Sequence, residues 1–342
     1  MASPIALNTG KRSAVNAYWD HVCEQRQSII NTPIRSMREI AGLPFLIEFP
    51  DQKTAASISL PFPESDKTSA AFSITIWDSK TSPISPKWTA EDLLEKGAIA
   101  GFEDNDYPMV YDIGARSLSI ASLPSREAIY WTHDLCSIPY WEKGSFLRNL
   151  LHFGLPIENR RLVHAAAVGT EEGGVLIVGK GGAGKTTTAL SCLDTRLSYL
   201  SDDYCALSND GTPFAHQVFT SAKVSAESAK RLSLPFSANS GEKEVIDIQR
   251  LFPEKLISSF PLKAILFPTI GKGEKARIVP ANRSAVLQEL AASTIFQLPG
   301  KNNDTLPFLA AIVRKLPCFR LHLSQDMREN GNFLEHWIAH DC

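Results

Sequence analysis

Residues 175–188 read Val-Leu-Ile-Val-Gly-Lys-Gly-Gly-Ala-Gly-Lys-Thr-Thr-Thr, and this stretch decides the fold. Its first four residues are apolar, which is typical of a buried strand. Gly179–Thr186 then matches the phosphate-loop pattern G-x-x-x-x-G-K-[ST] at every fixed position. Glycines let backbone N–H groups turn inward around phosphate oxygens, and a following helix adds the positive end of its dipole. The stretch therefore predicts a site for a nucleoside triphosphate.

The residue types within this loop have separate expected roles. Lys185 is placed to reach the β- and γ-phosphates, and the Thr186 hydroxyl is placed to hold Mg²⁺. The expected cofactors are therefore ATP and Mg²⁺. The residues that we expect to hold the nucleotide are Gly179, Gly181, Gly182, Ala183, Gly184, Lys185, Thr186 and Thr187.

The pair Asp202-Asp203 follows the loop after one predicted helix and the short apolar run Leu197–Leu200. A helix of about eleven residues is about 16 Å long at ~1.5 Å per residue, and a strand of four or five residues returns the chain toward the loop. If that strand runs parallel to the first, both carboxylates arrive beside the phosphates. One aspartate can bind Mg²⁺, and the other can accept the proton of an attacking hydroxyl. Our working metal ligands are Thr186 and Asp203, and both aspartates stay candidates for the base.

Three segments together resemble the catalytic domain of HPr kinase/phosphorylase: Arg161–Gly169 (Arg-Leu-Val-His-Ala-Ala-Ala-Val-Gly), the loop Gly179–Thr186, and Tyr199–Asp203 (Tyr-Leu-Ser-Asp-Asp). That family places a histidine before the strand that carries the loop and an Asp-Asp pair soon after it. The same arrangement is similar to the nucleotide core of ATP-dependent phosphoenolpyruvate carboxykinase. The resemblance implies a phosphate-loop kinase core that binds ATP and Mg²⁺. In such a core His164 lies near the phosphates, and Lys185 and both aspartates are catalytic.

The resemblance is strong over residues 160–205. The loop has Gly-Lys-Gly-Gly-Ala-Gly-Lys-Thr where the family usually carries acidic and serine residues, and the glycine-arginine-asparagine signature of phosphorolysis is missing downstream. The chain better resembles the family's divergent branch of serine-kinase-like proteins. The implied acceptor is the Ser or Thr hydroxyl of a protein or peptide. Because family members often form oligomers, the resemblance also allows a homo-oligomer.

The expected fold class is α/β with α+β character overall, in which a phosphate-loop core of the HPr kinase/phosphoenolpyruvate carboxykinase type follows a strand-rich N-terminal region. At 342 residues the chain is long enough for two domains, and we divide it into 1–145 and 146–342. Residues 216–256 are polar and weakly patterned, which is typical of loops around a site. The strands expected in the N-terminal region are Pro44–Phe49, Phe72–Trp77, Met109–Ile113, Ser117–Ala121 and Ile129–Thr132. Those expected in the core include Leu162–Val168, Val175–Val178, Leu197–Leu200, Leu262–Phe267, Arg277–Val279 and Cys318–Leu323.

The composition is that of an ordinary globular protein, with 44% hydrophobic and 21% charged residues. A net charge of −2 without a basic run predicts no nucleic-acid or membrane-surface role. Six scattered cysteines, no apolar run long enough for a bilayer and no secretory leader together predict a cytoplasmic protein. Lys223 and Lys263 could place a cation near a transferred phosphoryl group, although surface positions are more typical of such lysines.

Three functions remain open from the sequence. The first is an ATP- and Mg²⁺-dependent kinase that phosphorylates a hydroxyl of a protein or peptide. The second is a small-molecule kinase with the same chemistry, in which the polar stretch 216–256 closes over a metabolite. The third is a non-catalytic regulatory module that binds a nucleotide and contacts a partner through its N-terminal region.

Overall fold

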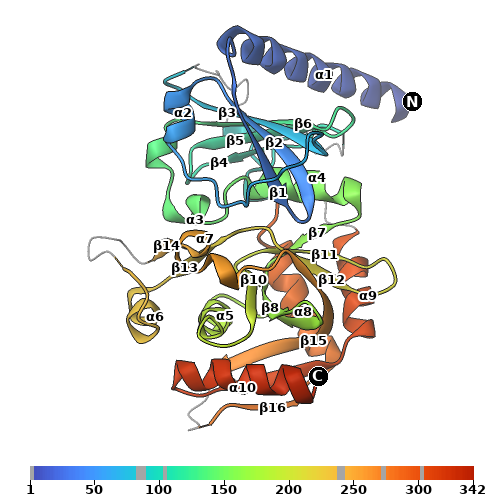
Figure 1. The fold of residues 1–342 in the computed structure, drawn as a ribbon. Coiled ribbons are helices and arrows are strands. Elements are labelled where there is room, and N and C mark those ends of the chain that lie inside the picture. The colour runs from blue at the N-terminus through green and yellow to red at the C-terminus, as the bar shows by residue number, and fades with distance from the viewer. Residues whose placement is uncertain (1–3, 82–89, 103–105, 237–242, 271–274, 301–303) are drawn as a thin grey trace.

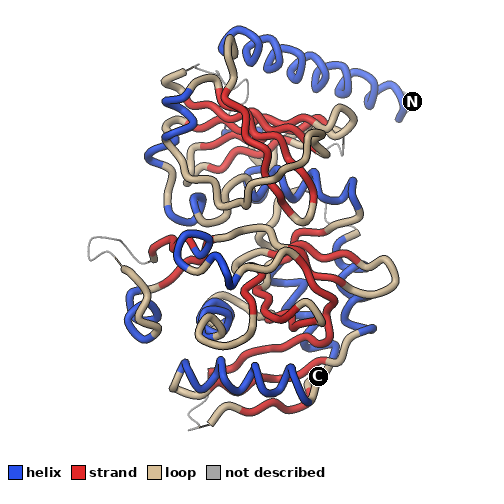
Figure 2. The backbone as a smooth tube through the Cα atoms, in the orientation of Figure 1, coloured by secondary structure: helices blue, strands red, loops and turns tan. Residues whose placement is uncertain are grey.

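The computed structural model describes residues 4–81, 90–102, 106–236, 243–270, 275–300 and 304–342. Figure 1 shows two regions stacked on one another, with the N-terminal half above and the C-terminal half below. The upper region is built on a six-stranded sheet and the lower region on a nine-stranded mixed sheet. Helices cover both sheets, as Figure 2 shows. The α/β class expected from the sequence is confirmed at this level, while the phosphate-loop type of the core stays a prediction.

The upper sheet contains all five strands predicted for the N-terminal region and one more at its edge. Its strand order is β1-β2-β3-β6-β5-β4. Residues alternate between its two faces, so that Ile129 and Trp131 meet helix α1 (Pro4–Ile29) while Tyr130 faces the rest of the molecule. The strands are β1 Ile34–Ile40, β2 Leu43–Phe49, β3 Phe72–Asp78, β4 Met109–Asp112, β5 Ser117–Ser122 and β6 Glu127–Thr132. Short helical segments in this half are α2 Gln52–Ala56, η1 Ala90–Asp92 and η2 Glu95–Gly97.

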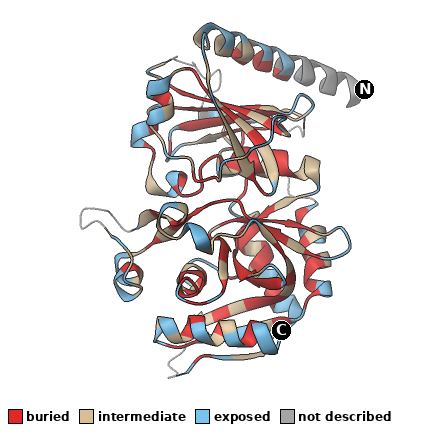
Figure 3. Ribbon diagram, viewed as in Figure 1, coloured by how far each residue is buried: buried red, intermediate tan, exposed pale blue. Residues whose placement is uncertain are grey.

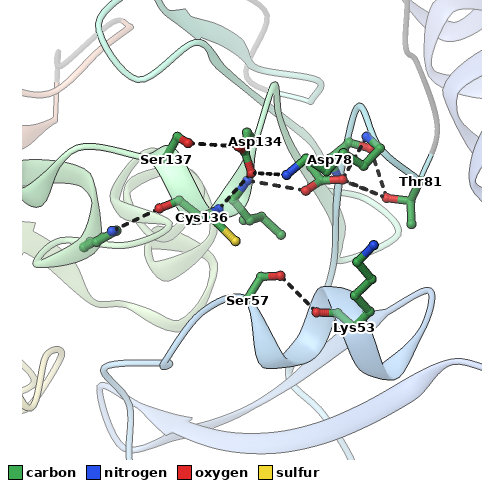
Figure 4. A network of polar contacts seen from close by, with 10 residues as sticks. Lys53, Ser57, Asp78, Thr81, Asp134, Cys136 and Ser137 are labelled. Atoms are coloured by element: carbon green, nitrogen blue, oxygen red, sulfur yellow. Dashed lines mark hydrogen bonds and ion pairs between the residues drawn. The ribbon is translucent and has the colours of Figure 1, made fainter.

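A polar network holds the segment after β6 against the end of β3 (Figure 4). Asp134 accepts hydrogen bonds from Lys80 Nζ at 3.1 Å and from Ser137 Oγ at 2.8 Å. Asp78, which is buried, accepts one from the backbone N–H of Leu135. These contacts anchor the chain that continues through η3 Leu135–Ser137, α3 Tyr140–Lys143, α4 Arg148–Gly154 and η4 Leu155–Glu158 toward the lower region.

The lower sheet follows the order β10-β8-β9-β15-β12-β11-β7, and β17 pairs with both β15 and β16. Strand β10 is antiparallel to β8, and β8 is antiparallel to β9. Strand β10 therefore runs in the direction of β9, with β8 between them, and it ends on the same side of the sheet. The strands are β7 Arg161–Val163, β8 Ala166–Thr170, β9 Gly173–Ile177, β10 Ser198–Ser201, β11 Cys205–Ser208, β12 Phe214–His216, β15 Ser259–Ile270, β16 Arg277–Pro280 and β17 Cys318–Leu323.

The central strands of this sheet are buried on both faces, which explains the uninterrupted apolar run before the glycine loop. Val175 and Ile177 pack with α5 (Lys185–Ser191) and α10 (Met327–His340). Leu176 and Val178 pack with α8 (Arg283–Ile295) and α9 (Thr305–Lys315) on the opposite face. Figure 3 shows the resulting buried interior between the helices.

The polar stretch 216–256, which we expected as loops, forms short regular elements over the described part of its length; residues 237–242 lie outside the described residues. It contains the two-stranded sheet of β13 (Ser221–Val224) and β14 (Glu244–Asp247). Helix α6 (Ala226–Arg231) follows β13, and α7 (Ile248–Leu251) and η5 (Pro253–Lys255) follow β14.

The upper and lower regions share one hydrophobic core. It contains Phe45 and Ile74 of the upper sheet together with Leu162, Tyr204 and Phe219 of the lower region. The division of the chain at residue 145 stays a prediction. No helix among the described residues is both long enough and apolar enough to cross a bilayer.

Candidate active site

The glycine loop lies between the end of β9 and the first turn of α5, as its sequence predicts. Gly184 is the N-cap residue of α5 and has φ +100°, a backbone conformation that residues other than glycine rarely adopt. A Cβ at Gly184 would also lie only 2.7 Å from Leu323 Cδ1 of β17. The loop is therefore shaped by its glycines, and its last residue packs tightly against the neighbouring strand.

Lys185 is turned back onto the loop that precedes it. Its Nζ donates to the carbonyl oxygen of Gly179 at 2.7 Å and approaches that of Lys180 at 3.4 Å. Burial lowers the pKa of Lys185, and the negative charges of Asp202 and Asp203 oppose that shift. The ammonium group is therefore held inside the loop, on the side where the aspartates lie.

Strand β10 delivers Asp202 directly beside the first turn of α5. The Thr186 hydroxyl donates to Asp202 Oδ1 at 3.1 Å. Burial raises the pKa of Asp202, and the negative charge of Asp203 raises it further. Asp202 Oδ2 is buried without a hydrogen-bond partner among the described residues. A buried carboxyl oxygen without a protein partner is costly, so this oxygen is suited to a polar or cationic ligand.

Asp203 differs from Asp202 because both oxygens of its carboxylate have side-chain partners. Lys223 Nζ lies 2.6 Å from Oδ2, His164 Nε2 lies 3.5 Å from Oδ1, and the Ser145 hydroxyl donates to Oδ2. Burial alone would raise the pKa of Asp203, but Lys223 and His164 outweigh it and hold that pKa well below its usual range. Asp203 also has φ +65°, in the left-handed region, so the backbone leaves its extended path just after β10. It is therefore an ionised group at neutral pH.

His164 reaches Asp203 because the strand predicted over Leu162–Val168 is broken. The chain leaves β7 after Val163 and enters β8 at Ala166, so His164 lies at a bend between two strands with different partners. Its backbone N–H donates to Thr294 Oγ1 at 3.2 Å, and its ring lies 5.3 Å from that of Tyr204. The prediction of one continuous strand over Leu162–Val168 was therefore wrong, because β7 and β8 pair with different strands. The break between them brings the His164 imidazole to Asp203.

Two residues of this site were not identified as such from the sequence. Lys223, which we took as more typical of the surface, is 12% exposed and bridges Asp203 to the carbonyl oxygen of Trp141. The sequence carried no signal for this role, because a lysine between two apolar residues is equally typical of the solvent-facing side of a strand. Ser145 lies 58 residues before Asp203, and no local pattern marks it. Lys263 does not line this site.

A cavity of about 470 Å³ lies over the loop. Every predicted site residue lines it except Gly179, whose carbonyl oxygen faces Lys185 instead. One wall comes from β13 and α6, within the stretch that we expected around a site, and the other comes from the end of β17 and the start of α10. The polar or charged residues of these walls are Lys223, Ser225, Glu227, Ser228, Arg231, Ser324, Gln325 and Asn330, and Lys243, just before β14, also lines the cavity.

The oxygen atoms around Asp202 fit Mg²⁺. Mg²⁺ prefers oxygen ligands and is usually held by one or two carboxylates together with the phosphates of a substrate. The Thr186 hydroxyl and the unpartnered Asp202 Oδ2 supply such ligands, and the loop beside them leaves space for phosphates. The pairing that we expected, Thr186 with Asp203, is not the contact found, because Thr186 touches Asp202. The described residues contain no group of three or more His, Cys, Asp or Glu side chains that could hold a metal unaided.

Comparison with known proteins adds little to this geometry. No protein-family model and no curated protein sequence matches the chain. Among solved structures, the chain is similar to the Hpr(Ser) kinase/phosphatase from Coxiella burnetii, with 12% sequence identity and a TM-score of 0.25 over 45% of this chain and 89% of that one.

Proposed function

We propose that this chain is an ATP- and Mg²⁺-dependent kinase that transfers the γ-phosphoryl group to a hydroxyl, with Ser or Thr of a protein or peptide as the acceptor. One observation carries the proposal. The same cavity is lined by Lys185 of the glycine loop, by Thr186 and Asp202, which suit a cation, and by the ionised Asp203. Phosphoryl transfer requires these parts, because its catalysis consists mainly of positioning and charge stabilisation.

The exposure and the partners of each residue indicate its role in the reaction. Lys185 and the loop N–H groups would bind the β- and γ-phosphates, while Thr186 and Asp202 would hold Mg²⁺, which supplies neutralisation of charge on the phosphate oxygens. Asp202 is 1% exposed, whereas the side chain of Asp203 is 23% exposed. An acceptor hydroxyl can therefore reach Asp203 more readily. We assign Asp203 as the base and Asp202 as the metal ligand.

In the transfer step, the acceptor oxygen forms a bond to the γ-phosphorus while the bond from that phosphorus to the β,γ-bridging oxygen breaks, which releases ADP. The hydroxyl proton passes to Asp203, which is ionised at neutral pH. Lys223 lies beside Asp203 and would stabilise the charge on the phosphoryl oxygens. His164 would orient the Asp203 carboxylate from its other oxygen.

The first test is transfer of ³²P from γ-labelled ATP with Mg²⁺ to host extract separated into proteins, peptides and metabolites. Lys185→Met should abolish transfer, because it removes the buried cation of the loop. Lys180→Met is the matched control: this lysine belongs to the same loop, is exposed and does not line the cavity. Acid-stable label on a protein or peptide that depends on Lys185 would support the proposal.

The two aspartates should behave differently in the same assay. Asp203→Asn should lower kcat by about 100-fold or more, the usual contribution of a positioned base. Asp202→Asn should mainly raise the Mg²⁺ and ATP concentrations needed for half-maximal rate. Full activity in both variants would contradict the assignment.

Two other functions remain as outcomes of this experiment. Label confined to the metabolite fraction would favour a small-molecule kinase, for which the wall formed by β13 and α6 would close over a free metabolite. Tight ATP binding without label in any fraction would favour a regulatory module.

A further inference from the structure

The oxygens of the Asp203 carboxylate are constrained from two parts of the chain. Oδ1 faces His164, which belongs to the lower region. Oδ2 receives the Ser145 hydroxyl and lies 2.6 Å from Lys223 Nζ. Because Oδ2 has two donors, the carboxylate can rotate only by breaking a hydrogen bond. Ser145 is itself 1% exposed, so this donor is not shared with bulk water.

Segment 141–145 also determines where Lys223 lies. Lys223 Nζ donates to the carbonyl oxygen of Trp141 at 3.1 Å. Gly144 lies against the same side chain, and a Cβ there would be 2.8 Å from Lys223 Cγ. The Ser221 hydroxyl, two residues earlier on β13, donates to the carbonyl oxygen of Gly144 at 3.3 Å. The segment therefore binds β13 on the face that carries Lys223.

This segment is anchored in the upper region. The Tyr130 hydroxyl of β6 donates to the buried carboxyl of Glu142 at 3.0 Å, and the Tyr130 and Phe146 rings pack edge to face at 5.0 Å. Upstream, Asp78 and Asp134 tie η3 to the end of β3 (Figure 4). A continuous series of contacts therefore runs from the upper sheet to Asp203 Oδ2, which Lys223 and Ser145 share.

We propose that Ser145, with the Trp141 carbonyl oxygen, is a positioning element that the N-terminal region supplies to the active site, holding Asp203 and Lys223 in their working orientation. The proposal rests on the function proposed above. It makes the strand-rich region part of the catalytic machinery, since the orientation of the base depends on it. A misplacement of a base by about 1 Å can cost on the order of 100-fold in rate.

The test compares three serine variants in the phosphoryl-transfer assay. Ser145→Ala should lower kcat about tenfold or more and change the KM for ATP less than twofold, because the phosphate loop is untouched. Ser145→Thr keeps the hydroxyl and should recover most of the rate. Ser137→Ala is the matched control, since it removes another serine–carboxylate hydrogen bond, to Asp134, away from the cavity. It should keep the wild-type rate.

A second measurement separates failure of this proposal from failure of the proposed function. In urea unfolding, Ser145→Ala should lower the midpoint in the wild-type background and change it much less in the Asp203→Ala background, because alanine offers no acceptor to the Ser145 hydroxyl and the two residues act through one bond. That result without any phosphoryl transfer would leave the positioning element in place and reject the kinase.

Three outcomes would overturn the proposal. The first is additive shifts of the urea midpoint, and the second is wild-type kcat in Ser145→Ala. The third is phosphate on Ser145 itself, found by mass spectrometry after incubation with ATP, which would make this serine an acceptor rather than a positioning residue.

Discussion

At the scale of single residues, the site depends on backbone conformations that few residue types tolerate. Gly184 has φ +100° and would place a Cβ 2.7 Å from Leu323 Cδ1. Gly181 lies three residues earlier in the same loop, and a Cβ there would meet nothing within 4 Å. Its φ is not in the left-handed region. Both glycines belong to the same loop, but only Gly184 has a backbone conformation and a close neighbour that require glycine.

We expect Gly184→Ala to destabilise the protein by about 1–3 kcal/mol, the usual cost of a strained backbone conformation. Gly181→Ala should leave the free energy of unfolding unchanged or slightly higher, since alanine restricts the unfolded chain. Urea unfolding of both variants measures the difference. Equal losses in the two would mean that the loop does not have the conformation described above.

At the scale of elements, helix α10 packs against α5 by way of a glycine. A Cβ at Gly331 would lie 2.1 Å from the carbonyl oxygen of Ser191, at the end of α5. No side chain fits there, so the backbones of the two helices approach closely. The helix that follows the glycine loop is thus held by the C-terminal helix.

Gly331→Ala should therefore destabilise the protein by about 1–3 kcal/mol, as overpacked sites do. In an exposed helix the same substitution would be stabilising by about 1 kcal/mol, so the sign of the effect is the test. Asn332→Ala, at the exposed neighbouring position, should cause little change. A higher thermal midpoint for Gly331→Ala would contradict the close packing.

At the scale of the whole molecule, the upper and lower regions meet over a buried surface that includes two histidines. His152 of α4 donates from Nε2 to the carbonyl oxygen of Pro299 at 3.1 Å. His216 lies 2.9 Å from Ser208 Oγ and close to Gly42 of the upper region. Burial lowers the pKa of each histidine to about 4. Both histidines are therefore neutral in the folded protein at neutral pH.

Stability should therefore fall as the pH drops from about 6.5 toward 4. In this window the unfolded chain binds protons at both histidines and the folded chain does not, so protonation favours unfolding; above pH 6.5 the contribution is complete. The slope is on the order of 1.4 kcal/mol per pH unit for each histidine. Urea unfolding at several pH values measures it. His152→Gln, which keeps an N–H donor, should reduce the slope by roughly half, and an unchanged slope would exclude this histidine.

The sequence by itself determined the features that are encoded by neighbouring residues. The glycine loop, the strand before it, the helix after it and the aspartate pair at the end of a short return strand follow from patterns of fewer than thirty residues. Backbone geometry then places them at one edge of the sheet, because β9 and β10 run in the same direction.

Only the tertiary structure decided which side chains surround Asp203. Ser145 and Lys223 come from segments 58 residues before it and 20 residues after it, and the break at His164 depends on pairing with two different strands. Local hydrophobic patterns contain no information about such contacts, since a buried lysine and a surface lysine look alike along the chain. The physical reason is that charge pairing and burial are properties of the packed molecule, in which the N-terminal region and the loop-bearing sheet share one core.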